Sequence, residues 1–185
     1  MISRRETFNL PNTITLMRIG VVPFLFILLS NPGEFWSLII AGLFVVASIT
    51  DFFDGYIARK YHMITTMGKF LDPIADKIIV NTAMILMIPI GRIPAWIVAL
   101  TIIRDLIVDV IRSIASSEGI YIQASILGKQ KTVTQIIAVT ALMIHYSIFG
   151  INAHIVGMVV LYIALFLTIY SGVDYFIKMY KSVVK

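Results

Sequence analysis

The sequence predicts an all-α protein that crosses a membrane six times, with a short helix at the membrane surface before the first crossing. Hydrophobic residues make up 59% of the chain and charged residues only 14%, whereas about 25% of an average soluble domain is charged. Mean hydropathy is +0.94. Apolar segments that are about long enough to cross a membrane recur, with short polar breaks between them. Such segments must be helical, because backbone amides that face lipid would otherwise lack hydrogen bonds.

The elements follow from these apolar segments. Residues 3–10 are expected to form the interfacial helix. Arg18 and the polar stretch Asn9–Asn12 interrupt the first apolar segment, so we expect it to be retained and not cleaved as a signal peptide. The six spans are expected at residues 13–30, 34–60, 69–90, 93–116, 131–149 and 151–178.

Three breaks separate neighbouring spans. Pro32-Gly33 divides the first from the second, and Gly91–Pro94 divides the third from the fourth. Residues 132–173 contain no Asp, Glu, Lys or Arg and are too long for one crossing. Gly150–Asn152 is the natural turn within this stretch, which therefore predicts a helical hairpin.

The basic residues predict the orientation. In a six-span arrangement nearly all of them fall on one side, and the opposite loops hold only Arg92. Positively charged loops remain in the cytoplasm, so both termini and this polar face are expected there. The residues on this side are Arg4, Arg5, Arg59, Lys60, Lys69, Arg112, Lys129, Lys131, Lys178, Lys181 and Lys185.

Composition also limits the function. The chain of 185 residues has the size of one domain, expected over residues 1–185, and it has no cysteine. A metal would need oxygen or histidine ligands, but His145 and His154 flank the last hairpin and are expected to have interfacial or packing roles. The net charge of +5 is not arranged as a nucleic-acid patch, so attraction to anionic membrane lipids is the simpler reading.

Four aspartates predict a metal site between the second and third spans. Asp51 and Asp54 are three residues apart, and Asp72 and Asp76 are four apart, so each pair shares one face of its helix. A short connection makes the two helices neighbours, and four carboxylates in a low dielectric need compensating charge. An all-oxygen set suits Mg²⁺ or Mn²⁺, with Ca²⁺ as an alternative occupant, and suffices for two ions.

Three residues beside these aspartates, Gly55, Ala58 and Arg59, have two readings each. Gly55 and Ala58 allow either close approach of a ligand or close helix packing. Arg59 offers a forked donor to a phosphate or a cytoplasmic anchor for the helix. Gly68 permits a turn with a positive φ.

Read together, residues 51–76 match the pattern D-x2-D-G-x2-A-R-x8-G-x3-D-x3-D. This pattern resembles the signature of the CDP-alcohol phosphatidyltransferase family. The resemblance implies that an acceptor hydroxyl attacks the lipid-linked phosphate of CDP-diacylglycerol and that CMP leaves. It implies two divalent cations held by Asp51, Asp54, Asp72 and Asp76, with Asp76 also the candidate general base. The CDP-binding residues expected from it are Asn12, Thr15, Gly55, Ala58, Arg59 and Gly68.

Two further segments, residues 9–18 and 128–135, resemble bacterial members of the family that use glycerol 3-phosphate as acceptor. This implies the bacterial inner membrane as location, with membrane lipids as surroundings and a homodimer left open. A phosphorylated acceptor needs a cationic pocket, for which the candidates are Arg104, Arg112, Lys129 and Lys131. The fourth span departs from the family's pattern, since Asp105 stands where Glu is usual and Asp109 is an additional acid.

Two alternatives stay open. The same chemistry could use inositol phosphate, serine or phosphatidylglycerol as acceptor. Charges within apolar segments also occur in ion or metal transporters. A transporter needs polar residues across the whole bilayer, however, and the acids here gather at one face, which favours the enzyme.

Overall fold

The computed structural model describes residues 33–60, 66–117, 126–148 and 150–183, together with Gly20 and Leu29. Side chains within these ranges are described except at residues 51–60, 66–76, 116, 126, 182 and 183. The interfacial helix expected over residues 3–10 and nearly all of the first span therefore lie outside the described residues.

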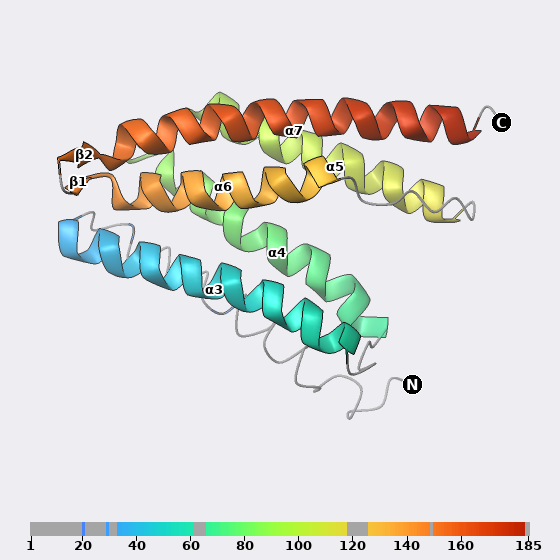
Figure 1. Cartoon of the computed structure of the whole chain (residues 1–185), viewed down its shortest axis with the longest axis horizontal. Helices are drawn as coiled ribbons and strands as arrows, with labels where there is room; N and C mark the ends of the chain where they lie inside the picture. Colours follow the sequence, from blue (N-terminus) through green and yellow to red (C-terminus); the bar gives the residue numbers. More distant parts are fainter. Residues whose placement is uncertain are drawn as a thin grey trace. The chain divides into compact units, whose positions relative to one another are not determined.

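The described part of the chain is mostly helical, which confirms the all-α class. The five later spans that were predicted correspond in order to five helices. Between the last two helices lie two strands of two residues each, which the sequence did not predict. The elements are α3 (Glu34–Lys60), α4 (Thr66–Met87), α5 (Ala95–Ser117), α6 (Ile126–Ile144), β1 (Ser147–Ile148), β2 (Ile151–Asn152) and α7 (Ala153–Val183) (Figure 1).

The predicted boundary of α6 was wrong. The helix begins at Ile126 and not at residue 131, so Lys129, which was expected before this span, lies within the helix. The charged residues end the apolar stretch but do not end the helix, because Lys and Gln are good helix formers.

The chain divides into two compact units, residues 1–90 and 91–185. In the first unit, α3 and α4 contact each other and converge at the end where the chain passes from one to the other (Figure 1). Ile40 and Phe44 of α3 and Met84 and Met87 of α4 are fully buried. Each of the two helices that carry the aspartates therefore also contributes fully buried apolar side chains to the core.

In the second unit, α6 and α7 lie side by side and α5 packs against α7 (Figure 1). Gly157 permits the close approach of α6 and α7, since a Cβ at that position would lie 2.9 Å from the backbone nitrogen of Leu142. Leu142 and Leu161 are buried in the same unit. A small residue at a close helix contact is typical of helices that pack within membranes.

The turn between α6 and α7 confirms the predicted hairpin. Gly150 has a φ of +78°, a conformation that favours glycine. The two short strands pair antiparallel around it. Asn152 then caps α7, because its side-chain oxygen accepts hydrogen bonds from the backbone amides of His154 and Ile155 at 3.0 and 3.2 Å.

The outward faces of the described helices carry many large apolar side chains. Exposed apolar surface on this scale is typical of a protein that contacts lipid or a partner. By length and composition, α7 is the one helix among the described residues that suits a membrane span, over Ala153–Lys181. Six crossings therefore stay a prediction. The exposed residues include Phe35, Val46, Leu106, Val110, Phe166, Tyr170 and Phe176.

Candidate functional site

The four aspartates lie on two helices of one unit. Asp51 and Asp54 are near the C-terminal end of α3, and Asp72 and Asp76 are near the N-terminal end of α4. Both segments are helical, so each pair keeps the spacing that places its members on one helix face. The side chains of these residues lie outside the described part, and the metal site therefore stays a prediction.

The residues expected to bind CDP also fall on these two helices or before them. Gly55, Ala58 and Arg59 lie in the last turns of α3. Gly68 lies within α4, which begins at Thr66, so it is part of a helix and not of a turn as one reading had it. Their side-chain contacts lie outside the described residues, as do Asn12 and Thr15 entirely.

A buried charge cluster joins the first two helices of the second unit. One carboxylate oxygen of Asp105, on α5, accepts hydrogen bonds from Arg104 Nη1 at 2.9 Å and from Lys131 Nζ on α6. Asp105 and Lys131 are 6% and 5% exposed. Charges buried to this degree are tolerated when they are paired and hydrogen-bonded, so Asp105 holds both cations in place.

The cluster extends to the third helix of this unit through Arg104. Its other terminal nitrogen, Nη2, donates to the hydroxyl of Ser171 on α7 at 2.8 Å. Within Arg104, Asp105 and Lys131, two cations face one carboxylate. The excess positive charge favours an anion beside the cluster.

The other two basic candidates differ in position. Arg112 follows Arg104 by eight residues, which brings it to a nearby face of α5, and its Cζ lies 5.6 Å from the ring centroid of Tyr175. Lys129 is exposed and precedes Lys131 by two residues, so it points to a different side of α6. The structure thus brings Arg104 and Lys131 together and sets Lys129 apart from them.

Sequence reasoning missed three residues of this region. It treated Asp105 as a departure from the family's pattern and not as the partner of Lys131. It also passed over Ser171 and Tyr175, which contact the two arginines of α5. The Ser171-Gly172 pair inside an apolar span was a usable signal, because small and hydroxyl side chains in such spans often face another helix.

A second polar cluster lies at the turns of this unit. Arg92 is 2% exposed and donates through Nη1 to the backbone oxygen of Met143 at 2.6 Å. Nearby, the Nδ1 atoms of His145 and His154 are 3.2 Å apart, so one ring donates to the other. Burial lowers the pKa of Arg92, although Tyr146 opposes this. Burial also lowers the pKa of His145, and the charges of Arg92 and His154 lower it further.

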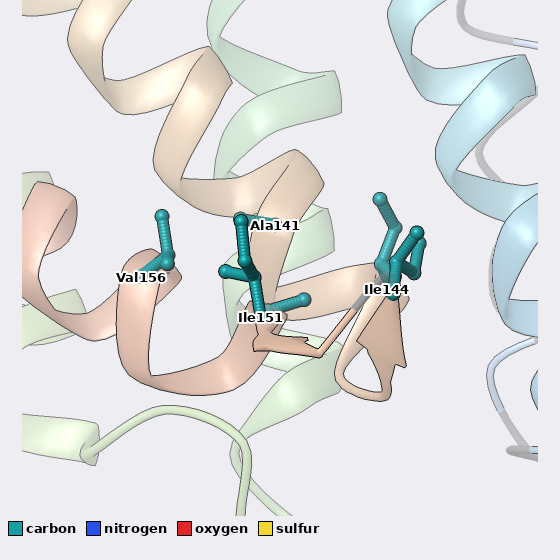
Figure 2. Close-up of a pocket in the computed structure, with 6 residues that line it drawn as sticks. Ala141, Ile144, Ile151 and Val156 are labelled. Carbon is teal, nitrogen blue, oxygen red and sulfur yellow. The ribbon is translucent and has the colours of Figure 1, made fainter.

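The described residues also form an apolar hollow of about 290 Å³ between α6, the strands and the start of α7. Figure 2 shows residues that line it, among them Ala141, Ile144, Ile151 and Val156. A hollow with only apolar side chains offers no donor to a phosphate or a nucleotide, so we do not assign the reaction to it. Its lining residues are Ala141, Ile144, Ile148, Ile151, Ala153 and Val156.

Comparison with known proteins agrees with the pattern in residues 51–76. The family model for CDP-alcohol phosphatidyltransferase matches residues 8–170. A CDP-diacylglycerol--glycerol-3-phosphate 3-phosphatidyltransferase of Bacillus subtilis (strain 168) is 39% identical, covering 95% of this chain and 97% of the relative. Proteins of the same name from Rickettsia typhi and Haemophilus influenzae are 40% and 35% identical, each covering 91% of this chain and 95% and 91% of the relatives. The chain belongs to the CDP-alcohol phosphatidyltransferase family.

Proposed function

We propose that this protein transfers the phosphatidyl group of CDP-diacylglycerol to sn-glycerol 3-phosphate, giving phosphatidylglycerophosphate and CMP. Membership of the family supports the reaction class and sets aside the transporter alternative. The names of the relatives support the acceptor. The structural observation that carries the proposal is the buried cluster of Arg104, Asp105 and Lys131, whose excess positive charge suits the phosphate of the acceptor.

On the donor side, Asp51, Asp54, Asp72 and Asp76 are the proposed ligands of two divalent cations, Mg²⁺ or Mn²⁺. The donor set fits, because carboxylates are the oxygen ligands that these ions prefer and the chain has no cysteine to compete. When bound, such cations stabilise the negative charge that develops on the departing CMP. Ca²⁺ is an alternative occupant of the same ligands.

The chain's own residues carry the remaining steps. The hydroxyl oxygen of the acceptor bonds to the lipid-linked phosphorus while the bond from that phosphorus to the oxygen of CMP breaks. Asp76 takes the hydroxyl proton. The cytidine diphosphate group is proposed to lie against Asn12, Thr15, Gly55, Ala58, Arg59 and Gly68.

On the acceptor side, Arg104 and Lys131 are the proposed central phosphate ligands, with Arg112 as an outer cation. Lys129 points to a different side of α6 and is the least direct of the four candidates. Arg104 is the accessible member of the central pair, since its side chain is 18% exposed and that of Lys131 is 6% exposed. A cationic site of this kind favours a phosphorylated acceptor over serine, which carries its own ammonium group. Inositol phosphate has the same charge requirement and is therefore the competitor to test.

The exposed apolar faces of the helices support a membrane location. We propose a single domain over residues 1–185 in the bacterial inner membrane, with six crossings, an interfacial N-terminal helix, and both termini and the reaction on the cytoplasmic side. The family match over residues 8–170 supports a single domain. A second copy of the chain is a candidate partner for the apolar surface.

The acceptor is tested by product analysis. Purified protein in detergent receives CDP-diacylglycerol, Mg²⁺ and one labelled acceptor at a time: glycerol 3-phosphate, inositol phosphate or serine. We expect a labelled lipid and stoichiometric CMP with glycerol 3-phosphate alone. A labelled lipid formed faster from inositol phosphate would reassign the acceptor, and release of CMP with none of the three would contradict the proposal.

A further inference from the structure

Arg104 is held by α7 through a hydroxyl whose polarity is fixed. An arginine has no acceptor, so the oxygen of Ser171 must accept from Arg104 Nη2. The single hydroxyl hydrogen of Ser171 is then free to donate along its own helix, and the backbone oxygen of Leu167 lies 2.6 Å away. Ser171 is 2% exposed. The contact is therefore a partly buried and directional anchor for one arm of the guanidinium group.

Gly172 makes room for the same side chain. A Cβ at this position would lie 3.0 Å from Arg104 Nε and 3.4 Å from its Cγ. Contacts of 3.0–3.4 Å are tighter than nine in ten real Cβ contacts, so a methyl group there would push the arginine aside by a few tenths of an ångström. One turn further along α7, the ring of Tyr175 lies beneath Arg112. Both arginines of α5 thus rest on one stripe of α7.

These anchors oppose a competing arrangement. Asp105 is the immediate neighbour of Arg104 and already accepts from its Nη1 at 2.9 Å. A carboxylate can take both arms of a guanidinium group, and such a bidentate pair would occupy the N–H donors that the acceptor phosphate needs. Because Ser171 takes the second arm, Arg104 contacts Asp105 through Nη1 and keeps further N–H groups for a ligand.

We propose that Ser171 and Gly172 are positioning residues for the acceptor, which hold Arg104 in the orientation that binds the phosphate of glycerol 3-phosphate. This inference rests on the acceptor site proposed above. It assigns a role in substrate affinity to α7, a helix that carries none of the residues of the family signature. The two residues act through Arg104 and are not themselves expected to touch the substrate.

Gly172→Ala is the sharpest test, because alanine is the better helix former and stability should be retained or rise. Small misplacements of a binding group cost large factors, so we expect the KM for glycerol 3-phosphate to rise about three- to tenfold. The kcat and the KM for CDP-diacylglycerol should change little, since only binding of the acceptor is weakened. Ser171→Ala, which removes the anchor without adding volume, should raise the same KM by about threefold.

Two other glycines serve as controls. Gly42→Ala adds a methyl group to α3 where nothing lies within 4 Å, so it should leave both KM values unchanged. Gly157→Ala adds one against Leu142 at 2.8 Å, so it should lower thermal stability without a selective effect on either KM. A selective rise in one KM, with stability retained, separates positioning from a general loss of packing.

The Arg104→Ala variant separates the positioning role of Ser171 and Gly172 from the acceptor site on which it rests. If Arg104→Ala raises the KM for glycerol 3-phosphate but neither Gly172→Ala nor Ser171→Ala does, the positioning role is wrong and the acceptor site stands. If Arg104→Ala leaves that KM unchanged, the acceptor site is wrong and the positioning role falls with it. Should Gly172→Ala fail to fold, Ser171→Ala decides the question alone.

Discussion

Replacing Asp105 by asparagine should destabilise the second unit of the protein. The side chains of Asp105 and Lys131 are 8% and 6% exposed, so the substitution removes the carboxylate of Asp105 from a buried ammonium group. Breaking a buried pair in this way costs about 3–5 kcal/mol. The amide oxygen of asparagine still accepts one hydrogen bond, and Arg104 is partly solvated at 18% exposure. We therefore expect the lower end of that range, about 3 kcal/mol.

Thermal unfolding in detergent at neutral pH measures this effect. For a chain of this length, 3 kcal/mol corresponds to a fall in Tm of about 6–12 °C. Asp174→Asn is the matched control, because Asp174 pairs with Lys178 at 2.6 Å on α7 and the two side chains are 28% and 50% exposed. An exposed pair contributes about 0–1 kcal/mol, so the control should change Tm little. Equal falls for both variants would refute the distinction between buried and exposed pairs.

A double variant tests whether the cost comes from the loss of the ion pair between Asp105 and Lys131. Asp105→Asn combined with Lys131→Met removes both charges, and replacing a whole buried pair is often close to neutral. We expect the double variant to recover at least about half of the lost stability, a coupling in the range measured for contacting residues. If the two losses simply add, Asp105 and Lys131 do not stabilise each other and the cluster has been misread.

Three further predictions concern other parts of the chain. Asp51→Asn should lower the rate of CMP release by at least about two orders of magnitude, because it removes charge stabilisation of the transition state; full activity of the wild type after thorough chelation would contradict the metal site. The pKa of His145 lies below its ordinary value of 6.5, so the unfolded state binds more protons as pH falls below 6.5, and stability is lost in that window. His145→Asn should make the fall in Tm between pH 7.5 and pH 5.5 smaller, and asparagine tolerates the φ of +64° at this position; an unchanged fall would exclude His145 as the cause. The hydroxyl of Tyr175 is buried without a hydrogen-bond partner among the described residues, so Tyr175→Phe should raise the free energy of unfolding by up to about 1 kcal/mol, and a loss of stability would reveal a partner.

The course of the helices was largely predictable because its signals are local. The second span was expected over residues 34–60, and α3 occupies Glu34–Lys60. Both of the later breaks contain a glycine in a left-handed conformation, Gly91 with φ +71° and Gly150 with φ +78°. Glycine adopts this conformation at little cost, so it marks such turns in the sequence itself. The start of α6 was missed because hydropathy indicates whether a segment lies in an apolar environment. It does not indicate where the backbone hydrogen bonds of a helix begin.

The contacts of the charged residues were not predictable in the same way. Lys131 follows Asp105 by 26 residues, and Ser171 follows Arg104 by 67. Helical spacing states which face of a helix a residue occupies, but it does not state which other helix lies against that face. The sequence could therefore indicate Arg104, Arg112, Lys129 and Lys131 as candidates. It left Asp105 and Ser171, the partners of Lys131 and Arg104, without a role.

The scarcity of charged residues explains why candidates could be found in the sequence and why their partners in the folded protein are so few. In a chain with 14% charged residues, a charge inside an apolar segment is costly unless it has a partner or a ligand. This cost is the reason that the aspartates and the arginines stand out as candidates in the sequence, and their roles as ligands stay predictions. The same cost means that each buried charge must be paired in the folded protein, so one carboxylate, Asp105, comes to hold two cations. An acceptor phosphate would compete with that carboxylate for Arg104. The affinity for substrate and the stability of the helix contacts therefore both depend on the charges of Arg104 and Asp105. A substitution at Asp105 should consequently alter both, whereas one at Gly172 should alter affinity alone.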